Sequence, residues 1–210
     1  DETLLAEVRA RVSDYAANPS TSKALQGDLI VPSFKYLLKN GGEEDYNLLM
    51  DLYNRVATNV EKKNVLLSLG AASSRALKTR TLEFAMSDVK KQDFFYCFHG
   101  ISSSGEEGRQ IAFEFFRDHF SDLQEKLRDA SPSLMNACII YTCSAFCTHA
   151  KANELEELLL KTLGEELKSS RRCIDQMLET MRANADFIES LKKSSLVEVA
   201  TWEALLAKMS

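Results

Sequence analysis

Apolar residues recur along almost the whole chain at intervals of three and four positions. Near the start, Leu5, Val8, Val12 and Tyr15 follow this spacing. Residues at these intervals lie on one face of an α-helix, so each such stripe predicts an amphipathic helix with one side buried. Similar stripes are Tyr46, Leu49, Tyr53 and Val56; Leu77, Thr81, Phe84 and Ala85; Leu134, Cys138, Tyr141 and Ala145; Leu155, Leu158, Leu159 and Leu163; and Ile174, Met177, Leu178, Met181, Ala185 and Ile188.

The predicted helices fall into pairs that begin near Gly42, Ser74, Gly105 and His149. The pairs are spaced by roughly thirty to forty-five residues, which is the period of a helical solenoid. One pair cannot bury its apolar face alone, so neighbouring pairs stack and form a curved surface. We therefore predict an all-α solenoid that binds or covers another molecule, as a single helical-repeat domain over residues 1–210.

Two segments carry more detailed predictions. The clearest helix is predicted over Gly105 to Arg128, with Phe116 in its apolar stripe and His119 in the core or at its boundary. A helix is also predicted over Lys91 to Ser103. The aromatic run Phe94 to Phe98 has the propensity of a buried strand, but its neighbours are helical and no partner strand is visible.

The last stripe consists of Val199, Trp202, Leu206 and Met209 and follows a short polar segment. An open solenoid end leaves apolar surface in water, so terminal repeats need a cap. We predict that residues 194–210 contain this capping helix and that it packs on the last helical pair.

Composition and charge narrow the class of protein. The chain has 210 residues, 45% of them hydrophobic, and a net charge of −5. This is enough apolar sequence for a sizeable core. There is no basic stripe, and the longest apolar runs break within about ten residues, well short of a membrane span. We expect neither nucleic acid nor a membrane as partner.

The five cysteines indicate the compartment. Their number is odd, and Cys138, Cys143 and Cys147 fall in one predicted helical region. A disulfide framework of a small secreted domain has a different pattern, so we interpret them as small buried residues in a reducing, cytoplasmic setting. The alternative for a longer parent protein is the endoplasmic reticulum lumen or another secretory compartment.

No catalytic or metal-binding motif is assembled in the chain. None of the three histidines has a second histidine three or four residues away, as a zinc-protease helix requires. The segment Gly100 to Gly105 has the two glycines of a phosphate loop, but Glu106 and Glu107 follow where a lysine and a hydroxyl are needed. We predict no catalytic residue, metal ligand or cofactor in this chain.

One set of residues has the composition of a binding face. Lys91, Phe95 and His99 are each four residues apart and share one face of the predicted helix. A cation, an aromatic ring and a titratable ring on one face can line a peptide-binding groove. The alternative is a helix edge on which Lys91 is solvated and Phe95 belongs to the core.

An ordered series of segments resembles a known family, over roughly residues 1 to 191. The chain is similar to the C-terminal helical domain of zinc aminopeptidases of the puromycin-sensitive type, and more distantly to endoplasmic reticulum aminopeptidases. Asn184 to Phe187 resembles the closing Asn-x-x-Trp of that domain, with Phe in place of Trp. The other matching segments are Leu66 to Ala71, Thr81 to Asp88, Gln92 to Phe95 and Gly108 to Phe116.

The resemblance implies a right-handed superhelix of HEAT-like antiparallel helix pairs. In that family, the domain folds over the catalytic domain of the same polypeptide and encloses a chamber for peptide substrates, while the catalytic domain holds the zinc. Basic and aromatic side chains on the concave face help to hold the far end of the peptide.

The expected function is thus that of a non-catalytic C-terminal fragment of a larger enzyme, which controls substrate access and length preference. Its start at Asp1 without an initiator Met agrees with this expectation. The alternative is a stand-alone helical-repeat adaptor that binds a protein partner. A two-histidine zinc helix encoded upstream distinguishes the two.

Overall fold

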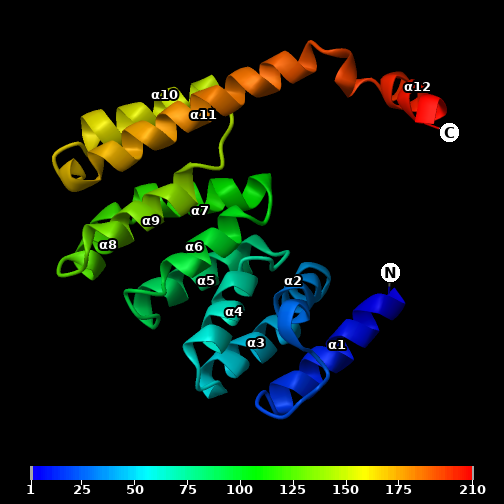
Figure 1. Ribbon diagram of the computed structural model, residues 1–210. Coiled ribbons are helices and arrows are strands. Elements are labelled where there is room, and N and C mark those ends of the chain that lie inside the picture. Colours follow the sequence, from blue (N-terminus) through cyan, green and yellow to red (C-terminus); the bar gives the residue numbers. More distant parts are fainter. Residues whose placement is uncertain (1, 210) are drawn as a thin grey trace. The chain divides into compact units, whose positions relative to one another are not determined.

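The computed structural model describes residues 2–209 and the side chains of residues 2–207. This part of the chain is helical and contains no strand, so the all-α prediction is confirmed. The aromatic run at Phe94 to Phe98 forms a turn and a helix, not a strand. The helices, shown in Figure 1, are α1 (Glu2–Ala17), α2 (Ile30–Asn40), α3 (Glu43–Arg55), α4 (Asn59–Leu69), α5 (Arg75–Ser87), α6 (Phe95–Ser102), α7 (Glu106–Asp118), α8 (Phe120–Leu127), α9 (Pro132–Cys143), α10 (His149–Glu156), α11 (Arg171–Lys192) and α12 (Val199–Met209).

The contacts divide the chain into two compact units, Asp1–Thr142 and Cys143–Ser210. In the first unit, consecutive helices pair as α1 with α2, α3 with α4, and α5 with α6. The helices α2, α4 and α6 also lie side by side, while α1 packs on α3 and α5 packs on α7. This unit therefore has two layers of helices with the core between them. The single-domain assignment and the right-handed superhelix stay predictions.

The core of the first unit is rich in aromatic side chains. Phe34, Phe94, Phe98, Phe113 and Phe116 are among its largest fully buried residues. Aromatic side chains bury large apolar areas, and such burial is the main favourable contribution to folding. The apolar stripes seen in the sequence thus supply the surfaces that hold the two layers together.

A buried carboxylate joins the first helix to the third. Arg9 on α1 donates two hydrogen bonds of 2.8 Å to the two carboxylate oxygens of Asp45 on α3. Asp45 also accepts a bond of 3.1 Å from the backbone N–H of Gly42, the N-cap residue of α3. The hydrogen bonds from Arg9 lower the pKa of Asp45 below its ordinary value, so the carboxylate stays charged near neutral pH. This one side chain caps a helix and fixes its neighbour.

The helices α4 and α6 approach each other so closely that only glycine fits. A Cβ atom on Gly70, just after α4, would lie 2.2 Å from the carbonyl carbon of Gly100 on α6. A Cβ atom on Gly100 would lie 2.6 Å from the carbonyl oxygen of Leu67. In both cases the obstacle is backbone, which cannot rotate away. The two glycines therefore set the spacing between α4 and α6.

The predicted helix from Gly105 to Arg128 is wrong at one point, because the structure divides it into α7 and α8 at His119. The backbone of His119 has φ −114° and ψ 24°, outside the helical region. Hydrogen bonds continue on both sides, from His119 N–H to Phe115 O and from Leu123 N–H to His119 O, so the break is a kink. The imidazole is 46% exposed and bonds to Asp122 at 3.1 Å, and it stacks on the buried Phe115 with ring centroids 4.2 Å apart, so His119 lies at the boundary of the core.

The helix predicted from Lys91 begins four residues later, at Phe95. Residues 91–94 form a turn, closed by hydrogen bonds from Asp93 N–H and Phe94 N–H to Lys90 O. Lys126 on α8 donates bonds of 2.9 Å to the carbonyl oxygens of Met86 and Val89, just before this turn. These carbonyls are held by a distant side chain, which the local sequence pattern does not reveal.

The second unit consists of α10, a π-helical turn (Glu157–Thr162), the long α11 and then α12, with short 3-10 turns at Lys168–Ser170 and Ser195–Val197. Figure 1 shows α12 beyond the C-terminal end of α11, where it lies against the turn Ser195–Val197. Trp202 is 52% exposed and donates a hydrogen bond of 2.8 Å to Leu196 O. The side chain of Met209 lies outside the described residues. The capping role of this helix stays a prediction, because Trp202 is largely uncovered here.

Replacement of Phe116 by alanine should lower the free energy of unfolding by about 3–5 kcal/mol. Phe116 has no exposed surface, so the change leaves a cavity in the core. Phe187→Ala is a matched control, because Phe187 is 63% exposed, and it should cost less than about 1 kcal/mol. Urea unfolding followed by circular dichroism measures both values, and equal losses would contradict the core described here.

Replacement of Gly70 by alanine should destabilise the chain by about 1–3 kcal/mol, because the new methyl group meets the backbone of α6. Gly42→Ala is the control, since a Cβ atom there meets nothing within 4 Å. The control should cost about 1 kcal/mol or less, the difference between glycine and alanine as N-caps. Thermal unfolding compares the two variants. A Gly70→Ala variant as stable as the original chain would show that α4 and α6 are not in close contact.

Candidate functional site

Helices α6 and α9 bring together three half-buried rings. Phe95 on α6 stacks on Tyr141 of α9, with ring centroids 5.8 Å apart and ring planes at 15°. His99, one turn further along α6, lies 4.4 Å from the same tyrosine ring. Two of the three predicted site residues therefore share a neighbour. We call Phe95, Tyr96, His99 and Tyr141 the aromatic face.

A cation from a neighbouring helix adds to the aromatic face. The ring of Tyr96 lies 4.5 Å from that of Phe95. The ammonium group of Lys63 on α4 lies 4.8 Å from the centre of the Tyr96 ring, which is within the range of a cation–π interaction. At an exposed position such a contact contributes about 0.5–1 kcal/mol. The face thus offers apolar ring surface with a positive charge at its side.

His99 is the titratable group of the face. Burial lowers its pKa below the ordinary value, and the positive charge of Lys35 on α2 lowers it further. Its Nδ1 lies 3.4 Å from the hydroxyl of Ser103. A neutral imidazole has one nitrogen that donates and one that accepts. At neutral pH His99 can therefore offer one hydrogen bond of each kind, one of them shared with Ser103.

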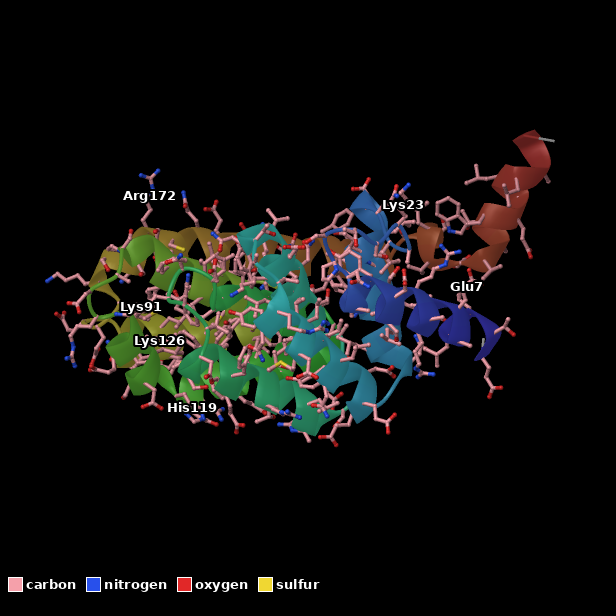
Figure 2. The ribbon with its side chains drawn as sticks, turned by 90° about the horizontal axis from the view of Figure 1, so that it is seen from below. Glu7, Lys23, Lys91, His119, Lys126 and Arg172 are labelled. Atoms are coloured by element: carbon pink, nitrogen blue, oxygen red, sulfur yellow. The ribbon has the colours of Figure 1, made fainter. Side chains whose placement is uncertain are left out.

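The structure does not bring Lys91 to the two rings. Lys91 is exposed in the turn before α6. Its charge acts on Lys126, and the two lysines lie close together in Figure 2. Among the described residues, Lys91 has no hydrogen bond, ion pair or ring contact with Phe95 or His99. It stands as a solvated cation beside the N-terminal end of α6.

Sequence reasoning missed three neighbours of the predicted residues. Tyr141, Lys63 and Lys35 come from α9, α4 and α2, far from α6 along the chain. The periodicity of α9 places Tyr141 on a helix face, but it does not say which helix that face meets. Only the packing of the layers brings these side chains to α6.

The described residues give no sign of a metal centre or a thiol nucleophile. No group of three or more His, Cys, Asp and Glu side chains among them is arranged to hold a metal ion. The cysteines Cys97, Cys138, Cys147 and Cys173 are free, and burial raises the pKa of the Cys138 thiol to about 12. Across residues 2–209, no helix is both long and apolar enough to cross a membrane.

Comparison with known sequences identifies a domain family. The family described as "ERAP1-like C-terminal domain" matches residues 1–183. This match covers α1 to α10 and more than half of α11. The end of α11, the turn Ser195–Val197 and α12 lie beyond it.

Several curated proteins are similar to the chain. Aminopeptidase M1-B of Oryza sativa subsp. japonica is 31% identical over 148 residues, which is 70% of this chain and 16% of that protein. Aminopeptidase M1 of Arabidopsis thaliana is 27% identical over 92% of this chain and 21% of that protein. The puromycin-sensitive aminopeptidase of Caenorhabditis elegans is 24% identical over 78% of this chain and 18% of that protein. The chain thus spans about a fifth of the length of these relatives.

The lowered pKa of His99 predicts a pH-dependent stability. The unfolded chain titrates near the ordinary value of about 6.5, so between the two pKa values the unfolded state binds more protons. The free energy of unfolding should therefore decrease as the pH falls through this interval. NMR titration of the imidazole should give a pKa below about 6.5, and Lys35→Gln should raise it. A pKa at or above the ordinary value would contradict the burial of His99.

Proposed function

The chain belongs to the family of ERAP1-like C-terminal domains, and we propose that it serves as the non-catalytic C-terminal domain of a zinc aminopeptidase. The family match over residues 1–183 carries this proposal, and the names of the three relatives support it. The chain spans about a fifth of those proteins, so the zinc and the catalytic residues belong to another part of the polypeptide. The catalytic domain of the same polypeptide is accordingly its partner.

The proposed role is to cover the active site and to shape the chamber in which peptides are held. A domain without catalytic groups affects turnover by controlling which substrates reach the active site and how they are positioned there. Contacts with the far part of a peptide then favour chains long enough to make them. Substrate access and length preference are the properties that this domain would control.

The aromatic face is the proposed contact for the far part of the peptide. Its rings are half-buried, so they are held by the fold and still present surface. Ordered rings lose little conformational freedom when they bind, which makes them effective contact surfaces. Phe95 and Tyr141 would contact apolar side chains, and His99 would donate a hydrogen bond to a backbone carbonyl.

Lys91 has a smaller role in this proposal. It is exposed, so an ion pair with the carboxylate of a peptide would contribute only about 0–1 kcal/mol. Its position in the turn before α6 would place such a pair at the N-terminal end of the aromatic face. The ion pair would contribute more to the orientation of the peptide than to its binding affinity.

A cytoplasmic location is also part of the proposal. Cys97, Cys138, Cys147 and Cys173 are free, and Cys97, Cys138 and Cys143 are buried. Proteins of oxidising compartments more often pair their cysteines as structural disulfides. A reducing compartment agrees with this pattern, and the endoplasmic reticulum lumen is the alternative for the parent enzyme.

Activity assays on two lengths of the protein test the proposal. The full-length polypeptide should hydrolyse aminoacyl substrates, and a zinc chelator should abolish this activity, whereas the isolated 210-residue chain should show neither activity nor stoichiometric zinc. Full-length protein without aminopeptidase activity, from a gene that encodes no two-histidine zinc helix, would favour the adaptor instead. Chelator-sensitive activity of the isolated chain would overturn the non-catalytic assignment.

In the full-length enzyme, Lys91→Ala combined with His99→Ala should change the turnover of long peptides by about two- to fivefold, the effect of losing weak exposed contacts. Turnover of a single aminoacyl reporter should stay the same, because it is too short to reach this domain. Steady-state kinetics with both substrates measure the ratio. Lys23→Ala is the control, since Lys23 is an exposed cation that lies far from Lys91 in Figure 2. Equal effects on both substrates, or on neither, would mean that Lys91 and His99 are structural.

A further inference from the structure

A second feature of the first unit is a cleft of about 560 Å³ rich in lysine. Its walls come from four places that are distant in the sequence: α2, the segment after α4 with the start of α5, the loop after α6, and the start of α7. The described residues that line it include three lysines and one acidic residue, Glu107. Its lining residues are Lys35, Tyr36, Lys39, Ala71, Ser73, Lys78, Ser103, Ser104 and Glu107.

Lys78 is the unusual member of this set. Its side chain is only 5% exposed, although lysine is seldom buried without a charged partner. Its ammonium group donates to the carbonyl oxygen of Ala72, and this is its single hydrogen bond among the described residues. An ammonium group carries three donors, so two of them have no acceptor in residues 2–207.

The charge of Lys78 is also incompletely compensated. No carboxylate among the described residues lies within the 4 Å of an ion pair with it, although Glu107 is close enough for its charge to act on the lysine. Burial lowers the pKa of Lys78, which shows the cost of desolvating its charge. A buried cation with free donors is stabilised when an anion binds beside it.

We propose that this cleft binds the phosphate group of a small phosphate ester, with Lys78 at its base and Lys35 and Lys39 at its sides. The volume lies within the range of small-molecule sites, which is roughly 300–1,000 Å³. The hydroxyls of Ser73 and Ser103 supply further polar groups to the walls. The three lysines carry more positive charge than Glu107 neutralises, and a dianion would balance the excess.

The type of cation favours phosphate over carboxylate. Arginine recognises planar carboxylates by two parallel hydrogen bonds, whereas lysine acts as a point charge that suits a tetrahedral group approached from several sides. None of the described residues that line the cleft is an arginine. Three lysines from two helices, α2 and α5, border one volume, which matches a ligand with acceptors in more than one direction.

The start of α7 borders the same volume. Ser103, Ser104 and Glu107 lie around the first turn of this 13-residue helix, whose N-terminal end carries a partial positive charge. The loop from Gly100 to Gly105 is not followed by the lysine of a phosphate-loop motif. Its serines nevertheless line a cleft that contains lysines from other elements. The positive charges come from α2 and α5, which a local motif search does not examine.

Calorimetry on the 210-residue chain tests the proposal, with inorganic phosphate and glycerol 3-phosphate as probes and succinate as the carboxylate control. Both phosphates should bind saturably at one site, and succinate should bind more weakly. Lys78→Met should weaken phosphate binding at least about tenfold, because it removes a charged hydrogen-bond donor. NMR spectra should show phosphate-dependent shifts at Ser103 and Ser104.

Two further variants keep the test decisive if Lys78→Met fails to fold. Lys35→Gln with Lys39→Gln, on partly or fully exposed side chains, should weaken phosphate binding about fivefold or more. Lys23→Gln, an exposed lysine outside the cleft, should leave binding unchanged. The proposal is wrong if neither phosphate binds saturably, if succinate binds as tightly, or if Lys23→Gln weakens binding as much as the cleft variants.

Discussion

The close approach of α4 and α6 at Gly70 and Gly100 is the constraint on which the first unit depends. Backbone meets backbone there, so the distance between the two helices cannot adjust to a larger side chain. A third glycine, Gly108 on α7, faces the carbonyl oxygen of Ile101 on α6, where a Cβ atom would come within 2.2 Å. Packing at this density transmits small shifts instead of absorbing them. The position of α6, and of every functional candidate on it, is therefore set by two neighbouring helices at once.

The aromatic face and the lysine cleft both follow from that placement of α6. Phe95 and His99 reach Tyr141 of α9 from one part of the helix. Ser103 and Ser104, which follow the helix, close one wall of the cleft. A short helix of eight residues thus connects two candidate sites. This helix is held in place by the glycine contacts and by the buried rings of Phe94 and Phe98. Phe94 and Phe98 belong neither to the aromatic face nor to the lysine cleft.

The sequence predicts the helices well, because a buried stripe at helical spacing is a local signal. Phe116 is fully buried as its stripe indicates. The kink at His119 and the late start of α6 are not predictable in this way. His119 keeps its place in the stripe but turns to Asp122, and the end of α5 is held by Lys126, about forty residues away. Sites formed by separate elements are harder to predict from the sequence. The spacing alone places Phe95 and His99 on one helix face. Tyr141 and Lys78 join their sites only through tertiary packing.

Lys35 belongs to the surroundings of both sites. It lines the cleft, and its charge lowers the pKa of His99. An anion in the cleft would offset that charge and so favour protonation of His99, which also contacts the ring of Tyr141 and the hydroxyl of Ser103. By linkage, the effect is reciprocal: whatever favours protonated His99 also strengthens binding of the anion. The charge of Lys35 would then couple the two sites.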